Sequence, residues 1–177
     1  LELIERIGET NESAYMQDVS HRNDIENALI INEVMPNPIG SDGGKEWFEL
    51  YNGWFTPIHL GGWTLEGGTS AESHVVDASV KIRSGGYSLL GQSSDTLNNG
   101  GYNPDYVYGT AISLSNFGEA LSIKDGSGQV VNVVEFDDTF PFSSGTSMEL
   151  IRPDYDNTIA DSWLSAGLPY GENGNMG

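Results

Sequence analysis

The sequence predicts an all-β protein, a sandwich built from short antiparallel strands. Short apolar runs with polar residues at alternate positions are separated by Asn, Pro and Gly, as in the segment Trp47–Asn52. This pattern is typical of strands joined by turns. The chain has 23 glycines and 7 prolines among 177 residues, which suits a turn-rich β protein better than a helical bundle. Its length fits one domain with a substantial core.

The first 27 residues differ from the rest. Leu1, Ile4 and Ile7 recur at a spacing of three among several glutamates, and this spacing predicts a short amphipathic helix with an acidic solvent face. We therefore divide the chain into an N-terminal arm or linker over residues 1–27 and a β-sandwich domain over residues 28–177.

Eight strands are expected in the sandwich domain. They are Leu29–Met35, Trp47–Tyr51, Trp63–Glu66, Val75–Ile82, Tyr87–Leu90, Ala120–Lys124, Val130–Phe136 and Ser147–Arg152. The clearest hairpin turn is Asp125–Gly128, whose glycines can adopt positive φ at little cost. The segments 91–109 and 137–146 are polar and rich in Gly and Pro, so we expect surface loops there. Trp47, Phe48, Leu50 and Trp63 are expected to fill the space between the sheets.

Several short motifs occur in a characteristic order along the chain. They are Ile30–Pro38, Glu46–Asn52, Leu60–Leu65, Ile82–Leu90, Leu114–Leu121, Gly145–Leu150, and Trp163 followed by Pro169, Gly171 and Asn173. In this order they resemble the lamin tail domain over about residues 27–173. The resemblance implies an immunoglobulin-like β-sandwich. The loop over residues 95–108 looks longer than the family core needs.

The resemblance also implies a class of function. In animals the domain lies in the tail of nuclear intermediate-filament proteins. In bacteria and archaea similar domains occur in secreted or surface proteins, often beside nucleases or phosphoesterases. The resemblance to the bacterial type of lamin tail domain implies a non-catalytic binding or structural module of a larger extracellular or cell-surface protein. Two alternatives are a calcium-stabilised adhesive module and an accessory domain that positions a neighbouring nuclease or phosphoesterase.

The residues themselves offer no catalytic signature. The sequence lacks the nucleophile-elbow, phosphate-loop, dinucleotide-binding and zinc-protease motifs. Its three histidines, His21, His59 and His74, have no metal-ligand spacing. The absence of cysteine rules out disulfides and thiolate zinc sites. We expect neither an enzyme nor a bound cofactor.

The composition limits the partners. The chain has 26 acidic and 7 basic residues, a net charge of −19. Such a surface repels phosphate backbones, and the sequence has no basic patch to neutralise them, so we do not expect the domain to bind nucleic acid. No run of about 18 apolar residues occurs, so no transmembrane segment is expected. The classes of partner still compatible with this composition are a protein and a glycan.

Two oxygen-rich segments are candidates for a calcium site. The first contains Asp95, Asn98 and Asp105, and the second contains Asp154 and Asp156. Calcium prefers several oxygen ligands from a flexible loop. Neither segment has the spacing of an EF-hand, and Asx-rich loops commonly form ordinary turns. Both interpretations stay open at this point.

Trp54 and Phe55 are the candidate partner-binding residues. They follow Asn52-Gly53 and precede Pro57, in a loop where the lamin tail resemblance implies polar residues. Aromatic side chains exposed at one end of a sandwich suit recognition of a protein or a sugar. The alternative, which we favour from sequence, is that they pack under the apolar residues of the N-terminal arm.

Overall fold

The structure is a computed structural model that describes residues 28–68, 72–77, 80–167, 169–170 and 175–176. The N-terminal arm over residues 1–27, and the helix expected in it, lie outside the described residues. In the described part of the chain, no helix is long and apolar enough to cross a membrane.

The larger sheet has six strands in the order β12-β11-β1-β2-β7-β8. Their bounds are β1 Leu29–Met35, β2 Trp47–Asn52, β7 Tyr87–Gly91, β8 Tyr106–Val107, β11 Met148–Leu150 and β12 Trp163–Ser165. Neighbouring strands are antiparallel except for β7 and β8, which run parallel. The sheet therefore has two short edge strands, β12 and β8.

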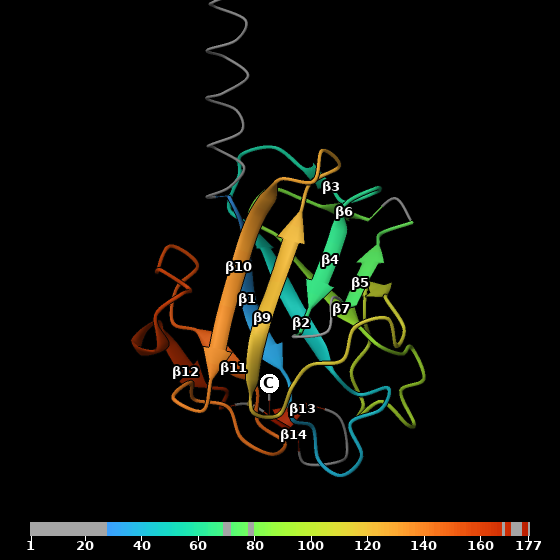
Figure 1. The fold of residues 1–177 in the computed structure, drawn as a ribbon, viewed down its shortest axis with the longest axis vertical. Coiled ribbons are helices and arrows are strands. Elements are labelled where there is room, and N and C mark those ends of the chain that lie inside the picture. The colour runs from blue at the N-terminus through green and yellow to red at the C-terminus, as the bar shows by residue number, and fades with distance from the viewer. Residues whose placement is uncertain (1–27, 69–71, 78–79, 168, 171–174, 177) are drawn as a thin grey trace, which may run out of the picture.

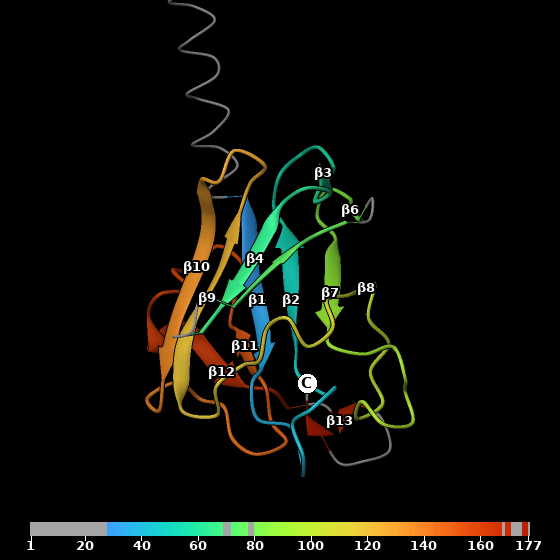
Figure 2. The same cartoon turned by 45° about the vertical axis from the view of Figure 1, so that its right-hand side comes forward.

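The smaller sheet has four antiparallel strands in the order β10-β9-β4-β5. Their bounds are β4 Thr64–Gly67, β5 Glu72–Val75, β9 Gly118–Lys124 and β10 Val130–Asp137. Two small sheets pair β3 Ile58–His59 with β6 Lys81–Ile82, and β13 Pro169–Tyr170 with β14 Asn175–Met176. Figures 1 and 2 show the two main sheets packed as layers, with β3 and β6 at one end and β13 and β14 at the other.

The core lies between the two main sheets. Alternate residues of both sheets point into it, and among those with no exposed surface are Ile31, Phe48, Leu65 and Leu121. This alternation is the reason for the apolar–polar pattern of the sequence. Phe48 and Leu50 lie in this core as expected, and Trp63 is half-buried against it. Trp47 does not, because it packs in a separate cluster with Met35 and Tyr102.

A bulge in β1 changes which way its residues face. Ile31 pairs with Leu50 and Glu33 pairs with Glu49, so Asn32 is the extra residue. Because side chains alternate along a strand, one extra residue moves Glu33 from the core side to the outer side of the sheet. The backbone N–H of Ile31 donates to Asn132 Oδ1 on β10 at 3.0 Å, which ties the two sheets together at the bulge.

The structure corrects several predicted strands. The segment Val75–Ile82 is not one strand: β5 ends at Val75 in the four-stranded sheet, and Lys81–Ile82 forms β6 beside β3. The predicted loop over residues 91–109 contains β8, and β3 and β12 were not expected. Such two- and three-residue strands are too short to show a period of two. The predicted hairpin turn is confirmed, with Gly128 at φ 86°.

Candidate recognition surfaces

Asn52 builds the loop that carries Trp54 and Phe55. This fully buried side chain donates from Nδ2 to the carbonyls of Thr56 and Ile82, both at 2.9 Å, and its Oδ1 accepts from Trp54 N at 2.8 Å. Ser84 Oγ adds a bond to the carbonyl of Trp54 at 2.6 Å. Asn is suited to this position because its amide can replace both a backbone donor and a backbone acceptor.

The two aromatic residues of this loop are not equivalent. Trp54 is half-buried and packs on the main core, whereas Phe55 is 74% exposed. Their ring centroids are 4.2 Å apart. Trp54 therefore supports the loop, and Phe55 is the aromatic side chain offered at its surface. The arm that was the alternative neighbour of this pair lies outside the described residues.

Two adjoining pockets form a groove next to this loop. One, of about 400 Å³, is lined by Ile30, Tyr51, Gly53 and residues 152–154. The other, of about 490 Å³, is lined by Ile30, Asn132 and residues 153–157. The two pockets share Ile30, Pro153 and Asp154, so they lie side by side. We call the pair the end groove.

Planar side chains line and border the end groove. Arg152 donates to both carboxylate oxygens of Asp154, at 2.9 and 2.7 Å, and its guanidinium lies 5.6 Å from the ring centroid of Tyr155. On the other side the ring of Tyr51 lies 4.9 Å from that of Tyr87, which is 51% exposed. Such a mixture of rings and fixed polar groups is common at recognition sites.

Each of the five proposed calcium ligands already has a partner within the protein. Asp95 accepts from Asn98 Nδ2 at 2.7 Å, and Asp105 accepts from Leu89 N at 2.8 Å. Asp154 is paired with Arg152, as described above. Asp156 accepts from the backbone and hydroxyl of Thr158, and the hydroxyl bond in particular lowers the pKa of this carboxyl. Asp95 and Asp156 make the contacts of Asx turns, Asp154 forms a local ion pair, and Asp105 binds the backbone of β7.

The two oxygen-rich segments are not brought together. Residues 95–105 lie near β7 and β8, and residues 154–156 lie between β11 and β12, so the segments occupy opposite edges of the six-stranded sheet (Figure 1). Within the described residues, no three His, Asp or Glu side chains are grouped as a metal site.

Four acidic residues hold the segment 113–116, which lies just before β9. Its consecutive residues donate in turn to Glu72, Glu46, Glu119 and Asp42, from backbone N–H groups and finally from the side chain of Asn116. We call this arrangement the carboxylate clamp. Burial raises the pKa of Glu46 to about 8 and that of Glu119 to about 7. No local sequence pattern marks these four carboxylates as a group, because they contact the segment from positions distant in sequence.

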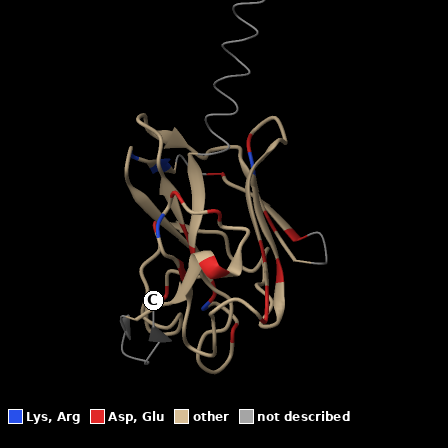
Figure 3. Cartoon of the chain, turned by 90° about the vertical axis from the view of Figure 1, so that its left-hand side faces the viewer, with Lys and Arg blue, Asp and Glu red and all other residues tan. Residues whose placement is uncertain are grey.

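A second acidic group lies on the outer side of the six-stranded sheet. Glu33 on β1 is directly opposite Glu149 on β11 and Glu49 on β2. We call these three residues the acidic strip. Burial raises the pKa of Glu33 to about 7, with Glu49 and Glu149 adding to the rise, and burial also raises the pKa of Glu49. Acidic residues outnumber basic ones over the whole molecule (Figure 3).

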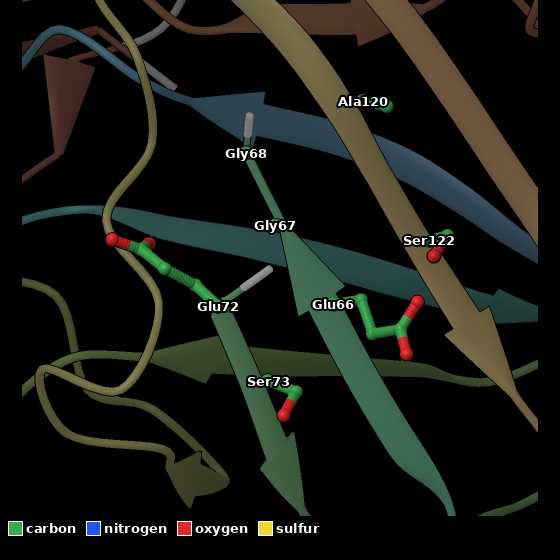
Figure 4. Close-up of a pocket in the computed structure, with 7 residues that line it drawn as sticks. All are labelled: Glu66, Gly67, Gly68, Glu72, Ser73, Ala120 and Ser122. Atoms are coloured by element: carbon green, nitrogen blue, oxygen red, sulfur yellow. The ribbon is translucent and has the colours of Figure 1, made fainter. Parts of the chain in front are cut away.

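The four-stranded sheet carries a shallow pocket of about 400 Å³ over β4, β5 and β9 (Figure 4). Small residues such as Ser73, Ala120 and Ser122 hollow it out. Its two carboxylates are engaged: Glu66 is paired with Lys124 at 2.6 Å, and Glu72 accepts from Ser113 N. Both carboxylates of the pocket therefore bind other parts of the protein and stabilise the fold.

One chain of polar side chains has the connectivity of a catalytic relay. His74 Nε2 lies 2.7 Å from the hydroxyl of Tyr106, which donates to Asp77 Oδ1 at 2.8 Å. The same hydroxyl accepts from the backbone N–H of Asp77. These bonds tie β8 to the end of β5, and they link the two main sheets at that edge.

Two sheets packed face to face, with a shared core and a mainly antiparallel topology, define the protein as an immunoglobulin-like β-sandwich. A comparison with known families matches residues 25–138 to the Lamin Tail Domain, and the chain therefore belongs to the lamin tail domain family. The motifs from Gly145 onward lie beyond the matched residues. No curated protein matches the chain. The family is one of structural and binding domains.

Proposed function

We propose that the protein is a non-catalytic binding module of a larger bacterial extracellular or cell-surface protein. The observation that carries this proposal is the exposed ring of Phe55 on a loop fixed by Asn52, beside the end groove. An exposed apolar side chain alone is ordinary. A rigid loop that presents one next to a groove loses little conformational entropy when a partner binds.

The engagement of the polar side chains supports a module without catalysis. The carboxylates of the clamp hold backbone N–H groups, and the His74–Tyr106–Asp77 chain joins two strands. A nucleophile or general base needs a side chain that can reach a substrate. In the described surfaces, these groups instead maintain the fold.

Phe55→Ala tests the binding role. Labelled protein would be incubated with cell-envelope material from the organism that produces it, and the sedimented fraction would be measured. We expect the variant to lower the bound fraction several-fold, because the ring supplies the exposed apolar contact. Leu97→Ala is the matched control, since Leu97 is 87% exposed on a different loop. Equal binding by wild type and both variants would contradict the proposal.

The location is tested separately. An antibody against residues 28–167 should label intact cells, and external protease should degrade the domain without lysis. Labelling only after the cells are opened would overturn the extracellular assignment.

The calcium-stabilised adhesive module is the second candidate, because Asp154 and Asp156 both line the end groove. A thermal melt in EDTA, in millimolar calcium and in KCl of matched ionic strength tests it. A rise in Tm specific to calcium, lost in Asp154→Asn/Asp156→Asn, would support this candidate. A rise that KCl reproduces would be charge screening and would exclude it.

A further inference from the structure

The acidic strip places three carboxyl side chains side by side. Glu149, Glu33 and Glu49 occupy directly opposed positions on three adjacent strands, and like charges at such positions destabilise a sheet. The ion pairs between described side chains are Lys124–Glu66 and Arg152–Asp154, so no described lysine or arginine neutralises the strip. Above pH 7, where Glu33 is mainly ionised, no basic side chain in the described part of the chain compensates the negative charge of the strip.

A buried acceptor next to the strip also lacks a donor. Asn32, at the bulge, is 6% exposed, and its Nδ2 donates to Glu49 Oε1 at 3.1 Å. This contact fixes the amide orientation and leaves Oδ1 buried without a hydrogen-bond partner. An unpaired buried acceptor is costly, and the natural remedy is an N–H donor. The acceptor and the three carboxylates thus call for the same chemistry.

Apolar and aromatic surface borders the strip. Tyr51 follows Glu49 by two residues on β2 and therefore faces the same side, and its ring pairs with that of Tyr87 on the adjacent strand β7. At the other edge Leu164, opposite Glu149, is 56% exposed. Tyrosine faces attract guanidinium and ammonium groups. The apolar and aromatic surface around the strip therefore suits the aliphatic part and the charged group of a Lys or Arg side chain.

We propose that the outer face of the six-stranded sheet, centred on the acidic strip, docks an extended basic segment of a partner protein. This inference deepens the proposed binding function and rests on it. Neighbouring strands are about 4.8 Å apart, so the strip spans about 10 Å. Residues i and i+2 of an extended segment are about 7 Å apart on one side, so two Lys or Arg residues at alternate positions fit within the span of the strip and their long side chains can reach its carboxylates.

A second copy of this chain is a poorer occupant, because each copy carries the same strip and a net charge of −19. A divalent cation is also a poorer fit. The carboxylates stand in a row across three strands, and the described residues contain no acidic group arranged to enclose an ion.

The test is a titration of the protein with a nine-residue peptide of alternating Lys and Ser, at pH 8 and 150 mM salt, where Glu33 is mainly ionised. An alternating Glu and Ser peptide is the negative control. The site variant is Glu33→Gln/Glu49→Gln/Glu149→Gln. The matched variant is Glu135→Gln/Asp138→Asn/Asp161→Asn, which removes the same charge from exposed positions elsewhere.

We expect the Kd for the Lys/Ser peptide to rise at least tenfold in the site variant and less than twofold in the matched variant. In NMR spectra, the largest changes in backbone amide chemical shift on peptide binding should fall in residues 30–33, 49–51, 87–89 and 148–150. Equal weakening by both variants would mean diffuse attraction and would overturn the inference, as would shifts located elsewhere. Calcium shifting the same amides without peptide binding would also overturn it. If Phe55→Ala still reduces envelope binding in those cases, only the docking site falls.

Discussion

The carboxylate clamp and the acidic strip both consist of carboxylate side chains, but they differ in the hydrogen-bond donors that surround them. In the clamp each buried carboxylate accepts from the segment 113–116, and Glu46 also accepts from Gln92 Nε2. In the strip the described donors are one hydroxyl, Ser147 Oγ, and one amide, Asn32 Nδ2. The clamp has at least one donor for each of its four carboxylates, whereas the strip has these two donors for three carboxylates.

This difference separates a structural role from a recognition role. A buried carboxylate that accepts several N–H bonds fixes a backbone segment, and removing it leaves those donors unpaired. A carboxylate that faces like charges stores unfavourable energy that a cationic partner can release. Both groups have raised pKa values, so a raised pKa alone does not distinguish them. The donors do.

Glu46→Ala should have the largest effect on stability. It leaves the N–H of Leu114 and the amide of Gln92 without their shared acceptor inside the protein. We expect the free energy of unfolding to fall by about 3 kcal/mol, since each unpaired buried donor costs about 1–3 kcal/mol. Urea unfolding followed by tryptophan fluorescence measures it, with Glu135→Ala as the exposed control. A loss below about 1 kcal/mol would show that the clamp does not hold the segment.

The pH dependence tests both groups together. The folded-state pKa values of Glu33, Glu46 and Glu119 lie at about 7, 8 and 7, above their ordinary value of 4.5. A carboxyl with a raised folded pKa stabilises the fold fully below its unfolded pKa, and this contribution is lost as pH rises through the folded pKa. Stability should therefore fall by several kcal/mol between pH 5 and pH 8, since one pKa unit corresponds to about 1.4 kcal/mol and all three folded-state pKa values lie well above 4.5.

The variants resolve the two contributions. Glu33→Gln should flatten the curve between pH 5 and 7, and Glu46→Gln should flatten it between pH 5 and 8, so the two variants differ mainly between pH 7 and 8. Glu135→Gln changes the net charge equally and should leave the slope intact. Stability that rises from pH 5 to pH 8 would show that burial does not control these carboxyls.

Much of the fold can be predicted from the sequence, because a strand with one face on the core leaves an alternating pattern within a few consecutive residues. The alternation in Trp47–Asn52 and Val130–Asp137 reflects strands with one face on the core. The segment Val75–Ile82 resembles one strand because apolar and polar residues alternate from Val76 to Ile82, whereas β5 ends at Val75 in one sheet and β6 begins at Lys81 in another. That choice depends on partners distant in sequence, which no local pattern records.

The recognition surfaces could be predicted less well. Trp54, Phe55, Asp154 and Asp156 were candidates, but nothing in the sequence indicates that Asp154 and Asp156 line a groove with Gly53, next to that aromatic pair. The acidic strip was hidden by the bulge at Asn32. Without the extra residue, alternation from Ile31 would direct Glu33 into the core.

The smallest effect is expected in the strip itself, and its sign is opposite to that in the clamp. Glu33→Gln/Glu49→Gln/Glu149→Gln keeps an acceptor for Ser147 and Asn32 and removes two directly opposed pairs of like charges. At pH 8 we expect the free domain to gain about 1 kcal/mol, since each such pair is worth up to about 1 kcal/mol. Urea midpoints would be compared with Glu135→Gln/Asp138→Asn/Asp161→Asn, which should gain less. A loss of stability would place the strip with the clamp as a structural device. A gain together with weaker peptide binding would show residues kept for recognition at the expense of the free fold.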